Sequence, residues 1–255
     1  MKDITFRNSM KYGDLTTKLS LLILGLGNFR GRQIIKGILY IALEAAFIIF
    51  MIIKGISCLA GLPGLGSREQ EEIWNEKLGI YEYVQGDNSL LILLYGITVI
   101  FIICAYIILA VSSLKSAYNV ELRMKQGKHS NTFVEDIKAL FNENLHKLLL
   151  VLPVTGILVF TILPLVFMIS MAFTSYSKVD SHLVLFDWVG LENFKLIFNS
   201  GSSIGQSFWS VFGWTIIWAV LATFLNYILG ILVALLINRK GTKFKSFWRF
   251  IFILS

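Results

Sequence analysis

The stretch LLILLYGITVIFIICAYIILAV, at residues 90–111, decides the fold. It runs for 22 residues without a charged side chain. At 1.5 Å per residue, a helix of that length crosses the roughly 30 Å of hydrocarbon in a lipid bilayer. The sequence therefore predicts a membrane-spanning helix here, and the rest of the chain can be judged against it.

The composition of the whole chain agrees with a membrane protein. Of its 255 residues, 56% are hydrophobic and 15% are charged, whereas soluble domains have about 45–50% apolar and about 25% charged residues. Three further apolar stretches, at residues 34–56, 148–173 and 211–237, are also long enough to span. The first 18 residues are polar and charged, so we expect no cleavable signal peptide.

The fold class that follows is an all-α polytopic membrane protein with four complete transmembrane helices plus the start of a fifth. The fifth begins near Phe247, and the chain stops inside its apolar run at Ser255.

The distribution of lysine and arginine predicts the orientation. Seven of these residues lie in 1–36, six in 115–147 and five in 239–249, against three in 54–89 and two in 174–207. Basic residues concentrate in cytoplasmic segments, so we expect a cytoplasmic N-terminus. Anionic lipid head groups account for the formal net charge of +7, and no nucleic acid partner is needed.

Three connecting segments carry weaker signals. The apolar run at residues 19–26 is too short to span and has basic flanks, so we expect a helix on the cytoplasmic face. The acidic outer loop at 64–89 is expected to be small and locally helical. In the inner loop, Thr132 and Glu135 form a capping-box pattern before apolar residues at helical spacing. This amphipathic helix would lead into the third span, either contacting a cytoplasmic partner or lying on the membrane surface.

The sequence contains no pattern typical of catalysis, a metal or a bound cofactor. The glycine-rich segment at 61–66 has no strand before it and is interpreted as a turn. The pair Gly-Lys at 127–128 has Leu122 and His129 where a phosphate-binding loop needs Gly and Ser or Thr. We therefore expect neither enzymatic activity nor ATP binding by this route.

One helix face in the fourth span collects small and polar residues. They follow one another at spacings of three or four and therefore share a face: Thr223, Asn226, Gly230, Ala234 and Asn238. Such a face allows a second helix to approach closely, so the predicted role is helix packing. Asn226 is also a candidate for lining a substrate path, because an amide at membrane depth is costly.

Glu44 is the only acidic residue within the predicted spans. An ionised carboxylate is costly near the bilayer centre. Glu44 could act as a proton relay or ion site, or it could be protonated and hydrogen-bonded to a neighbouring helix in a structural role.

The last 110 or so residues contain five distinctive segments: MAFTSY at 171–176, WVGLENF at 188–194, NYILG at 226–230, ALLINRK at 234–240 and FWR at 247–249. With these segments, this part of the chain resembles the sugar-type permeases of binding-protein-dependent ABC importers. WVGLENF is similar to a Val-Gly-Leu-x-Asn-Phe segment that the family places on the outer face before its core domain. One departure is Ala172, where Ser is commoner. An extended N-terminal region with extra spans is similar to the maltose-type larger subunit.

The resemblance implies three parts of the chain. Residues 1–147 form an N-terminal region with two transmembrane helices, 148–205 the third helix and an outer loop, and 206–255 the start of the permease core. The family's cytoplasmic coupling loop would lie beyond Ser255. We therefore expect these 255 residues alone to insert into membranes without binding the ATPase stably.

The implied function is a permease subunit in the inner or plasma membrane of a bacterium. It would move a sugar or oligosaccharide delivered by an extracytoplasmic binding protein, driven by a separate cytoplasmic ABC ATPase dimer. A second permease subunit and the lipid bilayer are the other implied partners. The alternatives from the residues alone are a secondary transporter or channel subunit, for which Glu44 would be central, and a membrane-embedded assembly subunit.

The orientation can be tested by cysteine labelling in intact cells. Ser181→Cys in the outer loop should react with an impermeant thiol reagent, while Ser130→Cys should not. Labelling of the Ser130→Cys variant alone would contradict the predicted orientation.

Overall fold

The structure is a computed structural model that describes residues 4–69, 71–76, 79–84, 86–176, 178–179, 182–183, 185–199, 201–240 and 243–254. The chain divides into two compact units, Met1–Gly190 and Leu191–Ser255. The two units are described separately below. The three-part division expected from the sequence stays a prediction.

Four helices are long and apolar enough to cross a membrane, as the sequence predicted. They cover Ile34–Gly61, Ser89–Lys125, Leu145–Met171 and Ser203–Asn238. Their most apolar windows have mean hydropathies from 2.1 to 2.8. The mainly helical, multi-pass fold is thereby confirmed. The side of the membrane that each end faces stays a prediction.

The first and third spans are each interrupted by a short π-helical segment. The first consists of α4 (Ile34–Phe50), η1 (Met51–Gly55) and α5 (Ile56–Gly61). The third consists of α8 (Leu145–Ile157), η2 (Leu158–Ile162) and α9 (Leu163–Met171). In the third span Pro153 lies inside α8 and Pro164 lies in the first turn of α9. Pro164 has no N–H to donate to a carbonyl of the preceding turn, and η2 ends two residues before it.

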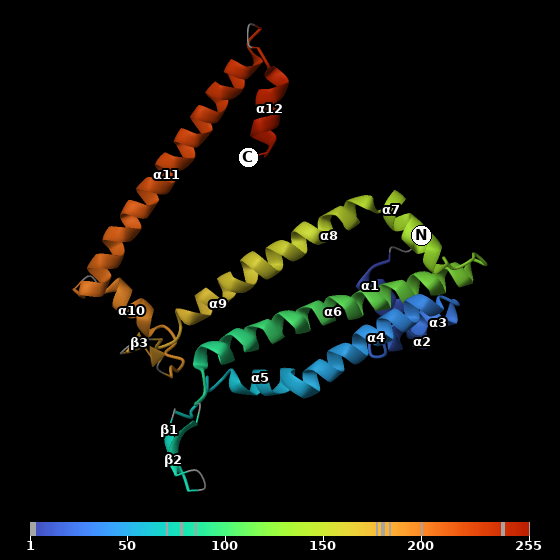
Figure 1. Cartoon of the computed structure of the whole chain (residues 1–255). Helices are drawn as coiled ribbons and strands as arrows, with labels where there is room; N and C mark the ends of the chain where they lie inside the picture. Colours follow the sequence, from blue (N-terminus) through green and yellow to red (C-terminus); the bar gives the residue numbers. More distant parts are fainter. Residues whose placement is uncertain are drawn as a thin grey trace. The chain divides into compact units, whose positions relative to one another are not determined.

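The second span, α6 (Ser89–Lys125), is much longer than the apolar run at 90–111. Its extension carries polar residues and continues because one face is covered: Ser113, Leu114, Ala117, Tyr118, Val120 and Glu121 are buried. The cover comes from α1 (Phe6–Tyr12), α2 (Leu15–Leu19) and α3 (Leu26–Arg30). Figure 1 shows these N-terminal helices gathered along the C-terminal half of α6, with α4 beside them.

The expected surface helix at residues 19–26 is wrong. Residues 20–25 form turns that join α2 to α3. Gly25, directly before α3, has a φ of +82°, a left-handed conformation that glycine adopts readily. Leu24, inside the turn, is fully buried. The apolar run is therefore the apex of a helical hairpin.

The expected helix in the outer loop at 64–89 is also wrong, because part of this loop forms a β-hairpin. Strand β1 (Glu71–Asn75) pairs antiparallel with β2 (Ile80–Val84), and Trp74 lies opposite Tyr81. Their rings meet edge to face at 5.0 Å, a cross-strand contact that favours strands over a helix. A second, two-residue pair joins β3 (Lys178–Val179) to β4 (His182–Leu183). The fold is therefore mainly helical, with two short strand pairs that the all-α prediction did not include.

Asp87 closes the base of the first hairpin. Its carboxylate accepts hydrogen bonds from the backbone N–H groups of Ser67 at 3.0 Å and Arg68 at 3.1 Å. These two bonds favour the ionised form and hold the pKa of Asp87 below its usual value. These bonds hold the two ends of the loop together, with Asp87 placed just before the start of α6.

The predicted amphipathic helix of the inner loop is confirmed as α7 (Phe133–Asn142). Thr132 and Glu135 form the capping box: the Thr132 N–H donates to Glu135 at 2.8 Å, and Thr132 Oγ1 accepts from the Glu135 N–H at 3.4 Å. The Thr132 backbone bond lowers the pKa of Glu135. After a break at residues 143–144, the chain enters α8, so α7 does not continue into the span.

An apolar cluster joins the ends of three spans in the first unit. Leu65, Leu93, Ile97 and Phe186 are buried together, with residues of α9 packed against them. The Trp188 indole N–H donates to the carbonyl of Leu62 at 2.8 Å. The WVGLENF segment that carried the family resemblance therefore begins at a residue that is anchored to the first span.

The second unit consists of α10 (Glu192–Phe198), α11 (Ser203–Asn238) and α12 (Lys245–Leu254). Ser202 caps α11 by accepting from the Gly205 N–H at 2.9 Å. The Trp209 indole N–H donates to the Ile197 carbonyl at 3.2 Å, which fixes α10 to the start of α11. The predicted start of a fifth helix near Phe247 corresponds to α12.

The structure improves the choice of labelling sites for orientation. Ser181 lies outside the described residues, and Ser130 is only 8% exposed, so a cysteine there would be shielded on either side of the membrane. Glu82, on β2, and Lys128, after α6, are both exposed and lie beyond opposite ends of α6. Labelling of Glu82→Cys but not Lys128→Cys in intact cells is the outcome expected for a cytoplasmic N-terminus.

Candidate functional site: a polar junction around the N-terminal helices

The first part of the junction is centred on Glu121, near the end of α6. Its side chain is 5% exposed. Oε2 of Glu121 accepts from the Asp14 N–H at 2.9 Å and from the Thr17 hydroxyl at 2.6 Å. The same carboxylate pairs with Lys125, one turn further along α6. A buried carboxylate is thus satisfied by donors that lie more than 100 residues earlier in the chain.

Asp14 adds an exposed ion-pair network to this cluster. Its carboxylate lies 3.2 Å from Lys125 and 3.1 Å from Arg30. The hydrogen bond from Lys125, followed by that from Arg30, lowers the pKa of Asp14, while partial desolvation opposes the shift. Two carboxylates therefore meet two cations, and the network joins α2, α3 and α6.

The second part of the junction satisfies the backbone of the α2–α3 turn. Ser113 of α6 accepts from the Gly25 N–H at 2.8 Å and donates to the Ser20 carbonyl at 3.1 Å. Glu44 of α4 accepts from the Leu24 N–H at 2.8 Å and from the Tyr106 hydroxyl at 3.3 Å. The predicted intramembrane acid therefore has two partners, one of them on a neighbouring span. Its role beyond these bonds stays a prediction.

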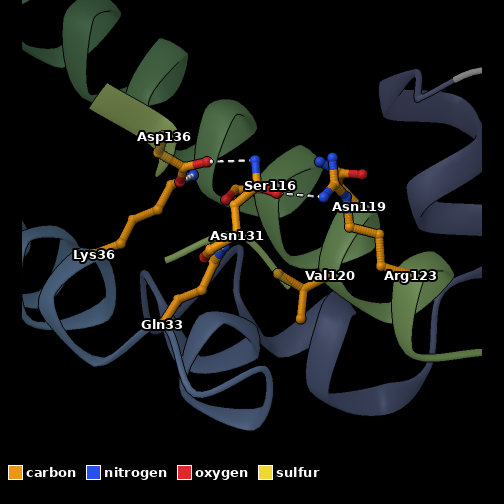
Figure 2. A pocket seen from close by; sticks show the side chains of 8 residues that line it. All are labelled: Gln33, Lys36, Ser116, Asn119, Val120, Arg123, Asn131 and Asp136. Atoms are coloured by element: carbon orange, nitrogen blue, oxygen red, sulfur yellow. Dashed lines mark hydrogen bonds and ion pairs between the residues drawn. The ribbon is translucent and has the colours of Figure 1, made fainter. Parts of the chain in front are cut away.

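The third part is a small polar cavity between α4, α6 and the start of α7 (Figure 2). Its volume is about 20 Å³, enough for roughly one water molecule. Asp136 accepts from Lys36 at 2.9 Å and from the Asn131 amide at 3.1 Å, and Figure 2 shows both groups directed at it. Gln33 donates to the Asn131 carbonyl at 2.7 Å, and Arg123 donates to the Asn131 side chain.

The size and chemistry of this cavity exclude it as a sugar site. Ligand sites usually enclose about 300–1,000 Å³. A second hollow, lined by Arg123, Lys138 and Glu143 among others, has about 340 Å³ but is open and has mostly exposed walls. The junction therefore positions helices, and neither of these two hollows is an enclosed pocket of the size that a sugar needs.

The predicted stripe on α11 lies on an exposed face. Nothing lies within 4 Å of the position that a Gly230 side chain would take. Asn226, the path candidate, and Ala234 are exposed as well. Thr223 donates to the Ala219 carbonyl of its own helix at 2.7 Å, and Asn238 accepts from Arg249 of α12 at 2.7 Å. The packing and path roles of this stripe stay predictions.

The sequence alone did not identify Glu121, Ser113 or Asn28; the Asn28 amide donates to Gln33 at 2.7 Å and to Ser116 at 2.9 Å. From the sequence, the second span is expected to end at Val111 and residues 115–147 to form an inner loop, because polar residues end the apolar run. A usable signal was present: Ser113, Ala117 and Glu121 recur at spacings of four on a helical face. Among the residues that the structure describes, no group of three or more His, Cys, Asp or Glu could hold a metal ion.

Comparison with known proteins defines the class of protein. The chain is 30% identical over 236 residues to the maltodextrin transport system permease protein MdxF of Bacillus subtilis, which is 91% of this chain and 50% of that protein. It is 30% identical over 238 residues to the maltodextrin transport system permease protein MalC of Streptococcus pneumoniae, again 91% and 50%. The galactooligosaccharides transport system permease protein GanP of Bacillus subtilis matches at 30% over 248 residues, 96% of this chain and 55% of that protein.

Four membrane-length helices and these matches indicate a multi-pass membrane protein that is homologous to bacterial transport permeases. More particularly, the chain is a homologue of sugar ABC-transporter permeases, and the resemblance noted in its C-terminal part is confirmed across nearly all of its length. The chain spans about half the length of the curated relatives it matches. No family profile matches the chain, and no solved structure matches it significantly.

The Glu121 cluster yields a stability prediction. Glu121→Ala leaves the Thr17 hydroxyl and the Asp14 N–H without their buried acceptor, a loss of about 1–3 kcal/mol in the free energy of unfolding. Thermal unfolding of the full-length protein in detergent should show a lower Tm than wild type. Glu143→Ala, which removes an exposed carboxylate near α7, is the matched control and should leave Tm unchanged. Equal Tm values for both variants would contradict a structural role for Glu121.

Proposed function

We infer that the chain is part of the membrane-spanning permease subunit of an ABC importer that moves a sugar or oligosaccharide. The observation that carries this conclusion is the 30% identity, over 91–96% of the chain, to permease proteins of maltodextrin and galactooligosaccharide transport systems. The four spans supply the membrane region that such a subunit requires. The substrate class is taken from what the relatives' names state about those relatives.

The proposed partners follow from the division of labour in such importers. A cytoplasmic ABC ATPase dimer would hydrolyse ATP, an extracytoplasmic binding protein would deliver the sugar, and a second permease subunit would complete the path. The sequence supports a separate ATPase, because the Gly-Lys pair at 127–128 has Leu122 and His129 in the positions that phosphate and magnesium binding require.

The proposed location is the bacterial inner or plasma membrane with a cytoplasmic N-terminus. The described structure supports this orientation, because basic residues gather around the junction at one end of α4 and α6. These residues are Arg30, Lys36, Arg123 and Lys125. Cytoplasmic ends of membrane helices carry such an excess of lysine and arginine.

Uptake by reconstituted full-length protein tests the proposed function. With its ATPase, second permease subunit and binding protein in proteoliposomes, the protein should accumulate labelled maltooligosaccharides or galactooligosaccharides only when ATP is supplied to the ATPase side. A protonophore should not reduce this uptake. Uptake that follows an imposed proton gradient without ATP would contradict the proposal and favour a secondary transporter.

Subunit assembly tests the predicted packing face on α11. Gly230→Leu places a bulky side chain on the small and polar face, so it should reduce recovery of the second permease subunit in co-purification. Gly213→Leu is a matched control, since Gly213 lies on the same helix and also has no neighbour within 4 Å. Equal recovery for Gly230→Leu, Gly213→Leu and wild type would show that the Gly230 face does not pack against a subunit.

A further inference from the structure

From Asp14 to Gly25 the chain runs along α6 from its C-terminal end toward its middle, and from Gly25 to Gly31 it runs back. Successive contacts with α6 show this path. Asp14 and Thr17 bond to Glu121. Gly25, at the apex, bonds to Ser113, eight residues nearer the middle of α6 and therefore roughly 12 Å further along its axis. Asn28 then bonds to Ser116 at 2.9 Å. The side-chain position of Gly31 would meet Val120. The segment is therefore a hairpin whose tip points along the span.

Contacts with α4, in the first span, place the hairpin tip at the same distance along the helices as the contacts with α6 do. Lys36 pairs with Asp136 at the polar cavity, and Glu44 bonds to Leu24. These two residues of α4 are also eight positions apart, roughly 12 Å along the helix. The second partner of Glu44 is Tyr106, which lies inside the uncharged run at 90–111. Two independent helices thus place Leu24 at the level of the apolar part of the spans.

At the apex, side chains accept hydrogen bonds from backbone N–H groups that have no helical partner. A turn needs such acceptors where water is absent. The Leu24 N–H reaches Glu44, the Gly25 N–H reaches Ser113, and the Gly27 N–H reaches Ser20 at 2.7 Å. Irregular backbone at membrane depth is tolerated only where protein groups satisfy it. Glycine permits the close fit: a Cβ at Gly25 would lie 2.7 Å from the Gly37 carbonyl, and one at Gly27 would lie 2.4 Å from the Ala117 Cβ.

The outer surface of the tip is apolar and exposed. Leu22 is 71% exposed and Ile23 is 49% exposed, directly beside the buried Leu24. The first span also carries exposed apolar residues on α4, with Ile38 at 57% and Ile41 at 39%. Both the tip and the first span therefore present apolar side chains outward, and burying such side chains in hydrocarbon is favourable.

We propose that residues 15–30 form a re-entrant hairpin whose tip, Leu22 and Ile23, contacts lipid acyl chains, held at that depth by Glu44 and Ser113. The occupant of this surface is lipid hydrocarbon. The cations Lys18 and Arg30 lie on the two arms, away from the tip, where the hairpin meets the head groups. This inference is independent of the transported substrate and of the partner ATPase.

Spin-label accessibility tests the proposal in the full-length protein in lipid nanodiscs, with Cys58 and Cys104 replaced by serine. A label at Leu22→Cys should collide several-fold more often with oxygen, which concentrates in hydrocarbon, than with a water-soluble nickel chelate. A label at Lys11→Cys, on the exposed side of α1, is the control and should show the reverse ratio. A Leu22→Cys ratio like that of Lys11→Cys would place the tip in water. Low collision with both reagents would mean that protein covers it. Either result overturns the proposal.

A second variant tests how the hairpin is held. Gly27→Val forces a clash with Ala117, so the nickel collision rate of the Leu22→Cys label should rise several-fold as the tip leaves the hydrocarbon. Gly156→Val, in α8, has open space around it and should leave the rate unchanged. An unchanged nickel collision rate in Gly27→Val would contradict the assigned position of the hairpin between α4 and α6. If Gly27→Val does not fold, the label measurement on the unmodified hairpin still decides the proposal.

Discussion

A backbone amide in hydrocarbon has no water to bond, and this constraint governs most of the structure. Four long helices satisfy their own amides and carbonyls. Where the backbone leaves the helical path beside the spans, side chains take over: Glu44 and Ser113 accept from the turn at Leu24 and Gly25. Glu44 of the first span and Ser113 of the second are thereby explained as acceptors for a neighbouring backbone.

The same contacts connect the beginning of the chain to distant segments. Glu121 binds residues of the N-terminal hairpin, and Gln33 and Lys36 bind the start of α7 through Asn131 and Asp136. These contacts hold the start of α7 against the first two spans, and α7 lies two residues before the third span. The proposed role in sugar import rests on the similarity to these relatives and not on a pocket.

The spans could be predicted from the sequence because their signal is local: an uncharged run such as 90–111 specifies its own helix. The capping box at Thr132 was predictable for the same reason. The extension of α6 to Lys125 was not, because it depends on cover by residues about 100 positions away. The β-hairpin at Trp74 and Tyr81 was not predicted. Its aromatic pair lies across two strands, and the acidic composition of the loop does not indicate that pairing. Glu44 was identified as unusual, but its partner Leu24 could not be found without the hairpin turn.

Amide hydrogen exchange across the hairpin tests the central claim most directly, namely that buried side chains satisfy its backbone at membrane depth. In full-length protein in nanodiscs, the amides of Leu24, Gly25 and Gly27 should exchange many-fold more slowly than the amide of the exposed Gly64 in the turn after α5. Glu44→Leu should accelerate exchange at Leu24 in particular. Exchange at Leu24 and Gly25 as fast as at Gly64 would contradict the account, because it would mean that the hairpin is open to water.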